Sequence, residues 1–311
     1  MSMTRSVKTA RNAQLMKQVK KHVPFYFFLL PALVLVVVFC YFPMWGIVIA
    51  FKDYKMARGI LGSEWVGLYH FKKVFSDPNF YRVLGNTIKI SILTLVTSFP
   101  VTICFALLVN EILNMKFKRV VQTITYMPHF LSWVTVAGML RDILSLDGIV
   151  NGFLTKLGME RIFFLGEAGM FRQIAVISDL WKGFGFGMIV YLAAISNIDQ
   201  NLYEAAEMDG ANRWQQTLHI TLPGIMPMII VMATLSLGNV LNAGFDQIFN
   251  LYSPLTYSTG DIIDTYVYRQ SLVNGQYSFG TAVGLFKSSI SLALTVVSYR
   301  IAYKYAGYRI F

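Results

Sequence analysis

Six long apolar stretches limit this 311-residue chain to one broad class of structure. The first runs from Pro24 to Phe51 without a charged residue, more than the ~20 residues with which a helix crosses a ~30 Å hydrocarbon core. Apolar residues make up 55% of the chain and charged residues only 14%, which a soluble domain of this size could hardly keep in solution. The sequence therefore predicts an all-α, multi-pass protein of the cell membrane. The expected spans are 24–51, 87–109, 120–140, 173–195, 224–242 and 280–303.

The first stretch is expected to stay in the protein as a transmembrane helix. It is too long for the apolar region of a secretory signal, and no small-residue cleavage site follows it. The segment 1–23 before it is rich in Lys and Arg, which predicts a cytoplasmic tail. Six spans then return the C-terminus to the cytoplasm. The Lys and Arg counts of the other loops favour this orientation only slightly.

The net charge of +11 does not indicate nucleic-acid binding. The cations lie in the tail and at the ends of the spans, where anionic lipid headgroups attract them, so the expected partner is the lipid bilayer. Cys40 and Cys104 each lie inside an apolar span and predict no disulfide. His, Cys and Glu do not cluster at metal-ligand spacing either, so the sequence predicts no metal site.

The polar segment 197–223 stands between two apolar spans and is much longer than a simple turn. Asn201 with Glu204 three residues later fits a capping box at the start of a helix. Gly210 suits the left-handed position after the end of that helix. Asn212 can cap a second short helix that reaches Pro223. The expected structure is a helix, a glycine elbow and a second helix.

This segment resembles the E-A-A loop in the membrane subunits of ABC importers. The resemblance is carried by Glu204-Ala205-Ala206, by Asp209-Gly210-Ala211, and by Ile220, Leu222 and Pro223. Small alanines allow close approach of a partner, and carboxylates can accept from partner arginines. Thr217 departs from the pattern, because many relatives carry an aromatic residue there. With Asp209-Gly210-Ala211 the loop resembles that of the carbohydrate-uptake branch, which includes maltose-type and polysaccharide-type permeases.

The resemblance implies a permease of the type I ABC importer kind over residues 24–311, with 197–223 as its coupling loop. It also implies four kinds of partner: a second permease, two ATPase subunits, an extracytoplasmic solute-binding protein and an oligosaccharide. No G-x-x-x-x-G-K-[ST] motif or catalytic constellation is present, so the chain is not expected to be an enzyme or to hold a cofactor, and ATP with Mg²⁺ belongs to the partner ATPase. The residues expected to contact the ATPase are Glu204, Ala205, Ala206, Asp209, Gly210, Ala211 and Pro223.

Polar side chains inside the spans are candidates for substrate binding, because each is costly in hydrocarbon. Asn239, Asn242 and Asp246 recur every three or four residues, which predicts one polar stripe on a helix. Maltose-type permeases carry part of their sugar site at the positions of Trp181–Phe186 and a pair of asparagines at those of Asn239 and Asn242. The alternative is that these side chains bridge helices or the sister permease. The predicted substrate-binding residues are Lys182, Gly183, Phe186, Asn239, Asn242 and Asp246.

Lys182 stands where maltose-type permeases have an apolar residue, so something must offset its charge. Asp179 is one candidate, because residues three apart share a helix face. The other is a carboxylate of an acidic oligosaccharide in transit. His129 is expected to be a packed residue rather than a ligand. Lys287, nearer the end of its span, is expected to extend to the interface.

Two other classes of protein remain open from the residues. An ion-coupled secondary transporter could use the six spans and the polar stripe, although it would not need the E-A-A loop. A membrane scaffold or sensor could keep a docking loop but would not need intramembrane asparagines. ATP-dependent uptake that requires the solute-binding protein separates the three.

Overall fold

The computed structural model describes residues 22, 23 and 25–306, so most of the predicted tail 1–23 lies outside the described residues. The chain divides into two compact units, Met1–Leu68 and Tyr69–Phe311. The described residues are helical apart from loops and one antiparallel pair of two-residue strands. The predicted all-α class is therefore confirmed.

The first unit holds the first apolar helix, Phe25–Phe51, which agrees with the predicted span. It passes through a π turn and then a 3₁₀ segment. A short hairpin follows, in which the Lys52 ammonium donates to the carbonyl of Ile60 at 2.8 Å. The labelled elements are η1 (Val37–Tyr41), η2 (Phe42–Phe51), β1 (Lys52–Asp53), η3 (Met56–Arg58), α2 (Gly59–Gly62) and β2 (Glu64–Trp65).

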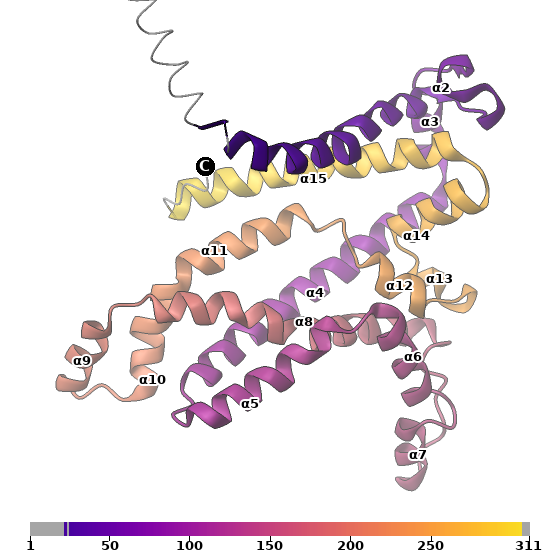
Figure 1. The fold of residues 1–311 in the computed structure, drawn as a ribbon. Helices are drawn as coiled ribbons and strands as arrows, with labels where there is room; N and C mark the ends of the chain where they lie inside the picture. The colour runs from indigo at the N-terminus through magenta and orange to yellow at the C-terminus, as the bar shows by residue number, and fades with distance from the viewer. Residues whose placement is uncertain (1–21, 24, 307–311) are drawn as a thin grey trace, which may run out of the picture. The chain divides into compact units, whose positions relative to one another are not determined.

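The second unit is a bundle in which α4 packs along α8, and α11 packs along α15 (Figure 1). Its longer helices are α4 (Pro78–Asn110), α8 (Ala168–Ser196), α11 (Leu222–Gly238) and α15 (Tyr277–Ala306). The shorter elements are α3 (Tyr69–Ser76), α5 (Met115–Tyr126), η4 (Met127–Phe130), α6 (Trp133–Ile143), α7 (Ile149–Lys156), α9 (Gln200–Met208), α10 (Arg213–Gln216), η5 (Thr217–Thr221), α12 (Phe245–Leu251), η6 (Pro254–Thr256), α13 (Tyr257–Gly260), α14 (Ile263–Tyr268) and η7 (Arg269–Val273).

The second span begins nine residues earlier than predicted. The Asp77 carboxylate accepts the backbone N–H of Asn79 at 2.9 Å, and Pro78 occupies the first helical position. An N-cap followed by proline is a strong helix start, because proline needs no donor there. The segment 78–86, which the apolar count leaves in a loop, is thus part of α4.

The prediction of one continuous helix over 120–140 is wrong. The segment forms α5, the 3₁₀ turn η4 and then α6, with Leu131 extended between them. Pro128 lacks a backbone donor, and the Ser132 hydroxyl caps the new helix by accepting the N–H of Thr135 at 3.1 Å. A proline and a cap four residues apart break the helix despite its apolar sequence.

Five described helices are long and apolar enough to cross a membrane. They are Phe25–Phe51, Pro78–Asn110, Ala168–Ser196, Arg213–Gly238 and Tyr277–Lys304. A sixth crossing would have to be made by the broken segment α5–η4–α6. The count of six and the cytoplasmic placement of both termini stay predictions.

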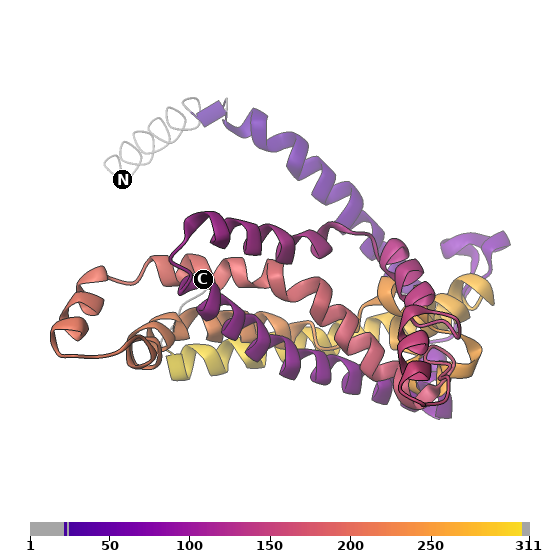
Figure 2. The ribbon, with the colours of Figure 1, turned by 90° about the horizontal axis from the view of Figure 1, so that it is seen from below.

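Close contact between α8 and α5 depends on a glycine. A Cβ at Gly185 would collide with the carbonyl of Thr125, so the two backbones can meet only at a residue without a side chain. Within the second unit, the elbow of α9 and α10 lies at one end of the long helices, and α6, α7, α12 and α13 lie at the other (Figure 2). This separation fits the prediction that the two sets of loops face opposite sides of a membrane.

Candidate functional site

A cavity of about 460 Å³ opens between α4, α8 and the end of α11. Its polar lining includes the carboxylate of Asp179 and the amides of Asn239, Asn242 and Gln247. Phe99, Met232 and Leu235 supply apolar surface. Amides and a carboxylate beside apolar faces suit a ligand that carries many hydroxyls on an apolar ring.

Asn239 and Asn242 line the cavity as a turn and not as a helical stripe. Helix α11 ends at Gly238, and Asn239 is its C-cap. The backbone N–H of Asn242 donates to the carbonyl of Asn239 at 2.8 Å, and its side-chain amide donates to Asn239 Oδ1 at 3.1 Å. The two amides hold each other in position, while their remaining donors and acceptors are available to a ligand.

Asp246 does not belong to the cavity lining. It lies in the first turn of α12, which starts after Gly244 in the left-handed conformation, at φ +77°. That turn breaks the register with α11, so Gly244 and Gln247 face the cavity and Asp246 is exposed elsewhere. The prediction of a continuous stripe through Asp246 is wrong, because the helix ends before it.

Lys182 and Phe186 form a second group on α8, directed at η4. The Lys182 ammonium donates to the carbonyl of His129 at 2.8 Å and lies 5.4 Å from the centre of the Trp133 ring. The Phe186 ring stacks on His129 at 4.0 Å with an interplanar angle of 3°. His129 is thus a packed residue, as its position beside a proline indicates.

The predicted pair between Asp179 and Lys182 is not formed. The two described side chains make no ion pair with each other, because Lys182 turns to the His129 carbonyl and Asp179 faces the cavity. Gly183 has open space where a Cβ would lie. The predicted substrate-binding set is therefore divided: Asn239 and Asn242 line the cavity, and Lys182 and Phe186 lie beside η4.

The coupling loop has the predicted form of helix, glycine elbow and helix, with one correction. Asp199, and not Asn201, caps α9, because its carboxylate accepts the N–H of Asn201 at 3.0 Å. The predicted cap two residues later becomes the second residue of the helix. The sequence contains two cap-forming residues within three positions, and the earlier one starts the helix.

The elbow after α9 is a Schellman turn centred on Gly210, whose φ is +80°. The N–H of Ala211 donates to the carbonyl of Ala206 at 2.9 Å, and that of Gly210 to Glu207 at 3.0 Å. Asn212 then forms the predicted cap, in a box with Gln215. The second helix does not stop at Pro223, because a π turn over Thr217–Thr221 carries it into α11.

The outer surface of this loop combines carboxylates with exposed apolar side chains. Glu204 and Asp209 are exposed, and so are Met208 at 88% and Trp214 at 69%. Arg213 pairs with Glu111 at 3.1 Å and so joins the elbow to the end of α4. A rigid elbow with exposed apolar and acidic groups is suited to docking on another protein.

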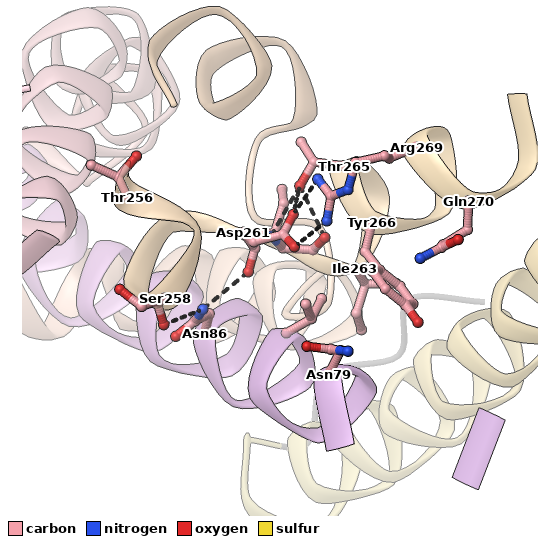
Figure 3. Close-up of polar contacts among 12 residues, drawn as sticks. Asn79, Asn86, Thr256, Ser258, Asp261, Ile263, Thr265, Tyr266, Arg269 and Gln270 are labelled. Atoms are coloured by element: carbon pink, nitrogen blue, oxygen red, sulfur yellow. Dashed lines mark hydrogen bonds and ion pairs between the residues drawn. The ribbon is translucent and has the colours of Figure 1, made fainter. Parts of the chain in front are cut away.

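A polar cluster at the opposite end of the second unit was not predicted from the sequence (Figure 3). Asp261 is fully buried; its carboxylate pairs with Arg269 at 2.5 Å and accepts the Thr265 hydroxyl at 2.9 Å. The Asn86 amide donates to the carbonyls of Ser258 and Asp261, at 3.1 and 3.2 Å. Asn86-Thr87 and Asp77-Pro78 were visible in the sequence, but nothing there pairs them with residues 258–269.

The same cluster extends to two further groups. The Arg172 guanidinium donates to Asn86 Oδ1 at 2.8 Å, and the Tyr266 hydroxyl donates to the Asp77 carboxylate. Burial and then the bond to Asp77 raise the pKa of Tyr266, so the phenol remains a donor. This cluster ties α4, α8 and α14 together.

Lys287 does not extend to the interface as predicted. Its ammonium pairs with the Asp264 carboxylate at 2.5 Å, and its side chain is only 15% exposed. No group of three or more His, Cys, Asp or Glu residues in the described part of the chain could hold a metal ion.

Known proteins similar to this chain are membrane permeases. The polygalacturonan/rhamnogalacturonan transport system permease protein YteP of Bacillus subtilis (strain 168) is 44% identical over 281 residues, 90% of this chain and 88% of that protein. The arabinooligosaccharides transport system permease protein AraP of the same strain is 28% identical over 298 residues, 93% of this chain and 91% of that one.

A solved structure supports the fold. One chain in the crystal structure of a bacterial ABC transporter involved in the import of the acidic polysaccharide alginate is 40% identical, with a TM-score of 0.87 over 94% of this chain and 99% of that one. Residues 98–306 match the family described as binding-protein-dependent transport system inner membrane component. The resemblance read from the E-A-A loop is thereby confirmed, and this chain belongs to that family of inner-membrane transport components.

Proposed function

We propose that this chain is the permease subunit of an ATP-driven importer of acidic oligosaccharides, and that it forms half of the translocation pathway. Two similar proteins are named for acidic polysaccharides, alginate and polygalacturonan/rhamnogalacturonan. The observation that carries the proposal is Lys182, a cation in a membrane-spanning helix that hydrogen-bonds a neutral carbonyl and makes no ion pair with a described carboxylate. A substrate carboxylate is the partner that would offset its charge.

The cavity lining supports the hydroxyl-binding side of the proposal. Asn239 donates to the Leu235 carbonyl and accepts from Asn242, which leaves the side-chain oxygen of Asn242 unbonded on the cavity. Asp179 offers a further acceptor to sugar hydroxyls. The Phe186 ring stacks on His129, the residue whose carbonyl bonds Lys182, so an aromatic ring lies near the cation. In this proposal the cavity amides bind hydroxyls, and Lys182, which lies outside the cavity lining and beside η4, selects for charge.

The exposed elbow is the proposed contact with one of two ATPase subunits. Glu204 and Asp209 would accept from arginines of the ATPase, and Ala205 and Ala206 would let its surface approach α9 closely. Gly210 shapes the elbow and Ala211 closes its turn, whereas Pro223 lies in the first turn of α11, beyond the elbow. ATP and Mg²⁺ bind the ATPase subunits, and closure of these subunits moves the elbow. The cavity, together with that of a second permease, then opens to one face of the membrane and to the other in turn. A solute-binding protein delivers the substrate outside, as befits the binding-protein-dependent family.

Uptake by the reconstituted complex tests the substrate and the energy source. Proteoliposomes that contain the complete importer, with ATP inside and the solute-binding protein outside, should accumulate a galacturonate tetramer and much less of a neutral glucan tetramer. Collapse of ion gradients should leave this uptake unchanged. Uptake that follows an ion gradient and not ATP would contradict the proposal and favour the secondary transporter.

Substitutions in the elbow test the docking surface. Gly210→Val places a β-branched side chain at a left-handed residue, and Glu204→Lys reverses an exposed charge. Both should abolish uptake and leave the amount of inserted protein unchanged. Gly158→Val is the matched control, because Gly158 is also left-handed, at φ +76°, but lies after α7 at the other end of the unit. Loss of uptake in the control alone would contradict the assignment.

A further inference from the structure

A groove of about 520 Å³ on the second unit lies apart from the cavity described above. It is formed by α12, α14, η7 and the start of α15, and its lining includes Phe245, Asp264, Tyr268, Ser271, Leu272 and Thr281. The first turn of α12 separates the two spaces, since Gly244 and Gln247 line the cavity and Phe245 lines the groove. The two spaces thus border on neighbouring residues of one helical turn.

The aromatic side of the groove is suited to a sugar ring. Phe245 lies 5.8 Å from Tyr268 and 5.2 Å from Phe249, and Phe249 lies 4.9 Å from Tyr268, measured between ring centres. Three rings in mutual contact hold one another in place. They offer rigid apolar surface of the kind that covers the C–H face of a pyranose.

The polar side of the groove includes a hydroxyl without a partner. Ser271 is only 8% exposed, and its Oγ makes no hydrogen bond. It sits over Gly280, where a Cβ would collide with it, so the glycine leaves room for the hydroxyl. A buried, unbonded hydroxyl is costly, and a rotation about χ1 that turns it from Gly280 into the groove, where a ligand bonds it, would remove that cost.

The charge balance of the groove permits an acidic ligand. Asp264 is the carboxylate in the lining, and its pair with Lys287 at 2.5 Å neutralises it. A single unpaired carboxylate would repel a uronate. The paired carboxylate can still accept sugar hydroxyls, because it has lone pairs beyond the one bonded to Lys287.

We infer that this groove is a second carbohydrate subsite, which binds one sugar ring of an oligosaccharide beside the translocation cavity. Phe245 and Tyr268 cover the ring face, and Ser271 and Asp264 bond its hydroxyls. The inference rests on the proposed function, since it concerns the same substrate. It adds a requirement that the cavity alone does not impose: only chains long enough to occupy both spaces gain from the groove.

Protection from labelling tests occupancy directly. Leu272 is 62% exposed and lines the groove, whereas its neighbour Val273 is 64% exposed and is not part of the lining. Leu272→Cys and Val273→Cys are made in a Cys40→Ser/Cys104→Ser background, and the complete importer is treated with a charged thiol reagent. A galacturonate tetramer should slow labelling at least three-fold at residue 272 and leave residue 273 unchanged. Equal rates with and without sugar at both residues would overturn the subsite.

Transport kinetics give a second and independent test. Ser271→Ala should raise the KM of the tetramer about three-fold, the size expected for one lost hydrogen bond, with kcat and the KM of a dimer unchanged. Tyr268→Ala should raise it further, and Tyr268→Phe, which keeps the ring, should not. A KM that is the same for all chain lengths in every variant contradicts the subsite. Wild-type importer that takes up no acidic oligosaccharide contradicts the proposed function instead.

Discussion

The polar cluster around Asp261 and the lining of the cavity contain the same kinds of side chain but bond them differently. In the cluster, the carboxylate of Asp261 is bonded to Arg269 and Thr265, and the Asn86 amide bridges two carbonyls and Arg172. In the cavity, Asp179 accepts no hydrogen bond from the described side chains, and Asn239 and Asn242 bond mainly each other. The polar side chains of the cluster are hydrogen-bonded within the chain. Those of the cavity keep donors and acceptors for a ligand.

This difference separates structural polar residues from candidate binding residues. A buried charge is tolerated when bonds replace the water it has lost, and the cluster supplies those bonds from helices far apart in the sequence. A cavity side chain can instead exchange water for a ligand. Loss of a cluster residue should therefore cost stability, and loss of a cavity residue should cost transport.

The largest expected effect is on stability at the buried pair. Asp261→Asn leaves the Arg269 guanidinium without its carboxylate, and breaking one side of a buried pair costs about 3–5 kcal/mol. The thermal midpoint and the folded yield of the purified complex should both fall sharply.

The matched control is an exposed pair in the same unit. Arg161 and Asp147 lie 2.7 Å apart with side chains 56% and 88% exposed, so Asp147→Asn should cost less than about 1 kcal/mol. Similar losses in the two variants would mean that the cluster does not stabilise the fold as its bonds indicate.

The local features of the coupling loop could be predicted from sequence, and the cluster could not. Gly210 and Asn212 act on amides a few residues away, so their roles can be read in a short window. Asn86 and Asp261 are 175 residues apart, and no local pattern joins them. The pair Asp77-Pro78 is a sequence signal for the start of α4. A count of apolar residues does not use that signal, because it starts a span only at the first apolar residues.

The errors within the spans have a common cause. Hydropathy finds apolar segments but does not find where a helix within them ends. Thus hydropathy does not show the break at Pro128, and it extends the fifth span through Asn239 and Asn242 although α11 ends at Gly238. Asn239 and Asn242 still line the cavity together, because amides three residues apart can share a turn as well as a helix face.

A second, smaller effect tests Lys182, which belongs neither to the Asp261 cluster nor to the cavity lining. Lys182→Met removes a charge whose hydrogen bond is to the neutral carbonyl of His129 and which makes no ion pair with Asp179, so folded yield should hold. The catalytic efficiency of uptake, kcat/KM, should fall about ten-fold for an acidic tetramer, the equivalent of ~1.4 kcal/mol, and stay within about two-fold for a neutral one.

Lys89→Met is the control for loss of a cation, since Lys89 is exposed on α4. It should change neither yield nor the ratio of acidic to neutral uptake. If Lys182→Met instead lowers yield and Asp179→Asn restores it, Asp179 offsets Lys182 electrostatically and the substrate carboxylate is not needed.

The smallest expected effect is at the cavity amides. Asn242→Ala removes an exposed amide whose described side-chain bond is to Asn239, so the free energy of unfolding should change by less than about 0.5 kcal/mol. The KM for uptake should rise about three-fold for acidic and neutral sugars alike, because an amide binds hydroxyls and not charge. Uptake measured over a range of sugar concentrations checks both statements.

The control uses an amide pair with the same donor–acceptor distance outside the cavity. The Asn274 amide donates to Gln270 at 3.1 Å and is exposed, as Asn242 is, but it does not line the cavity. Asn274→Ala should leave KM and stability unchanged. A rise in KM for Asn274→Ala but not for Asn242→Ala would show that free bonding capacity does not identify substrate contacts. Since loss of an exposed amide costs almost no stability, any change in KM then reports binding alone.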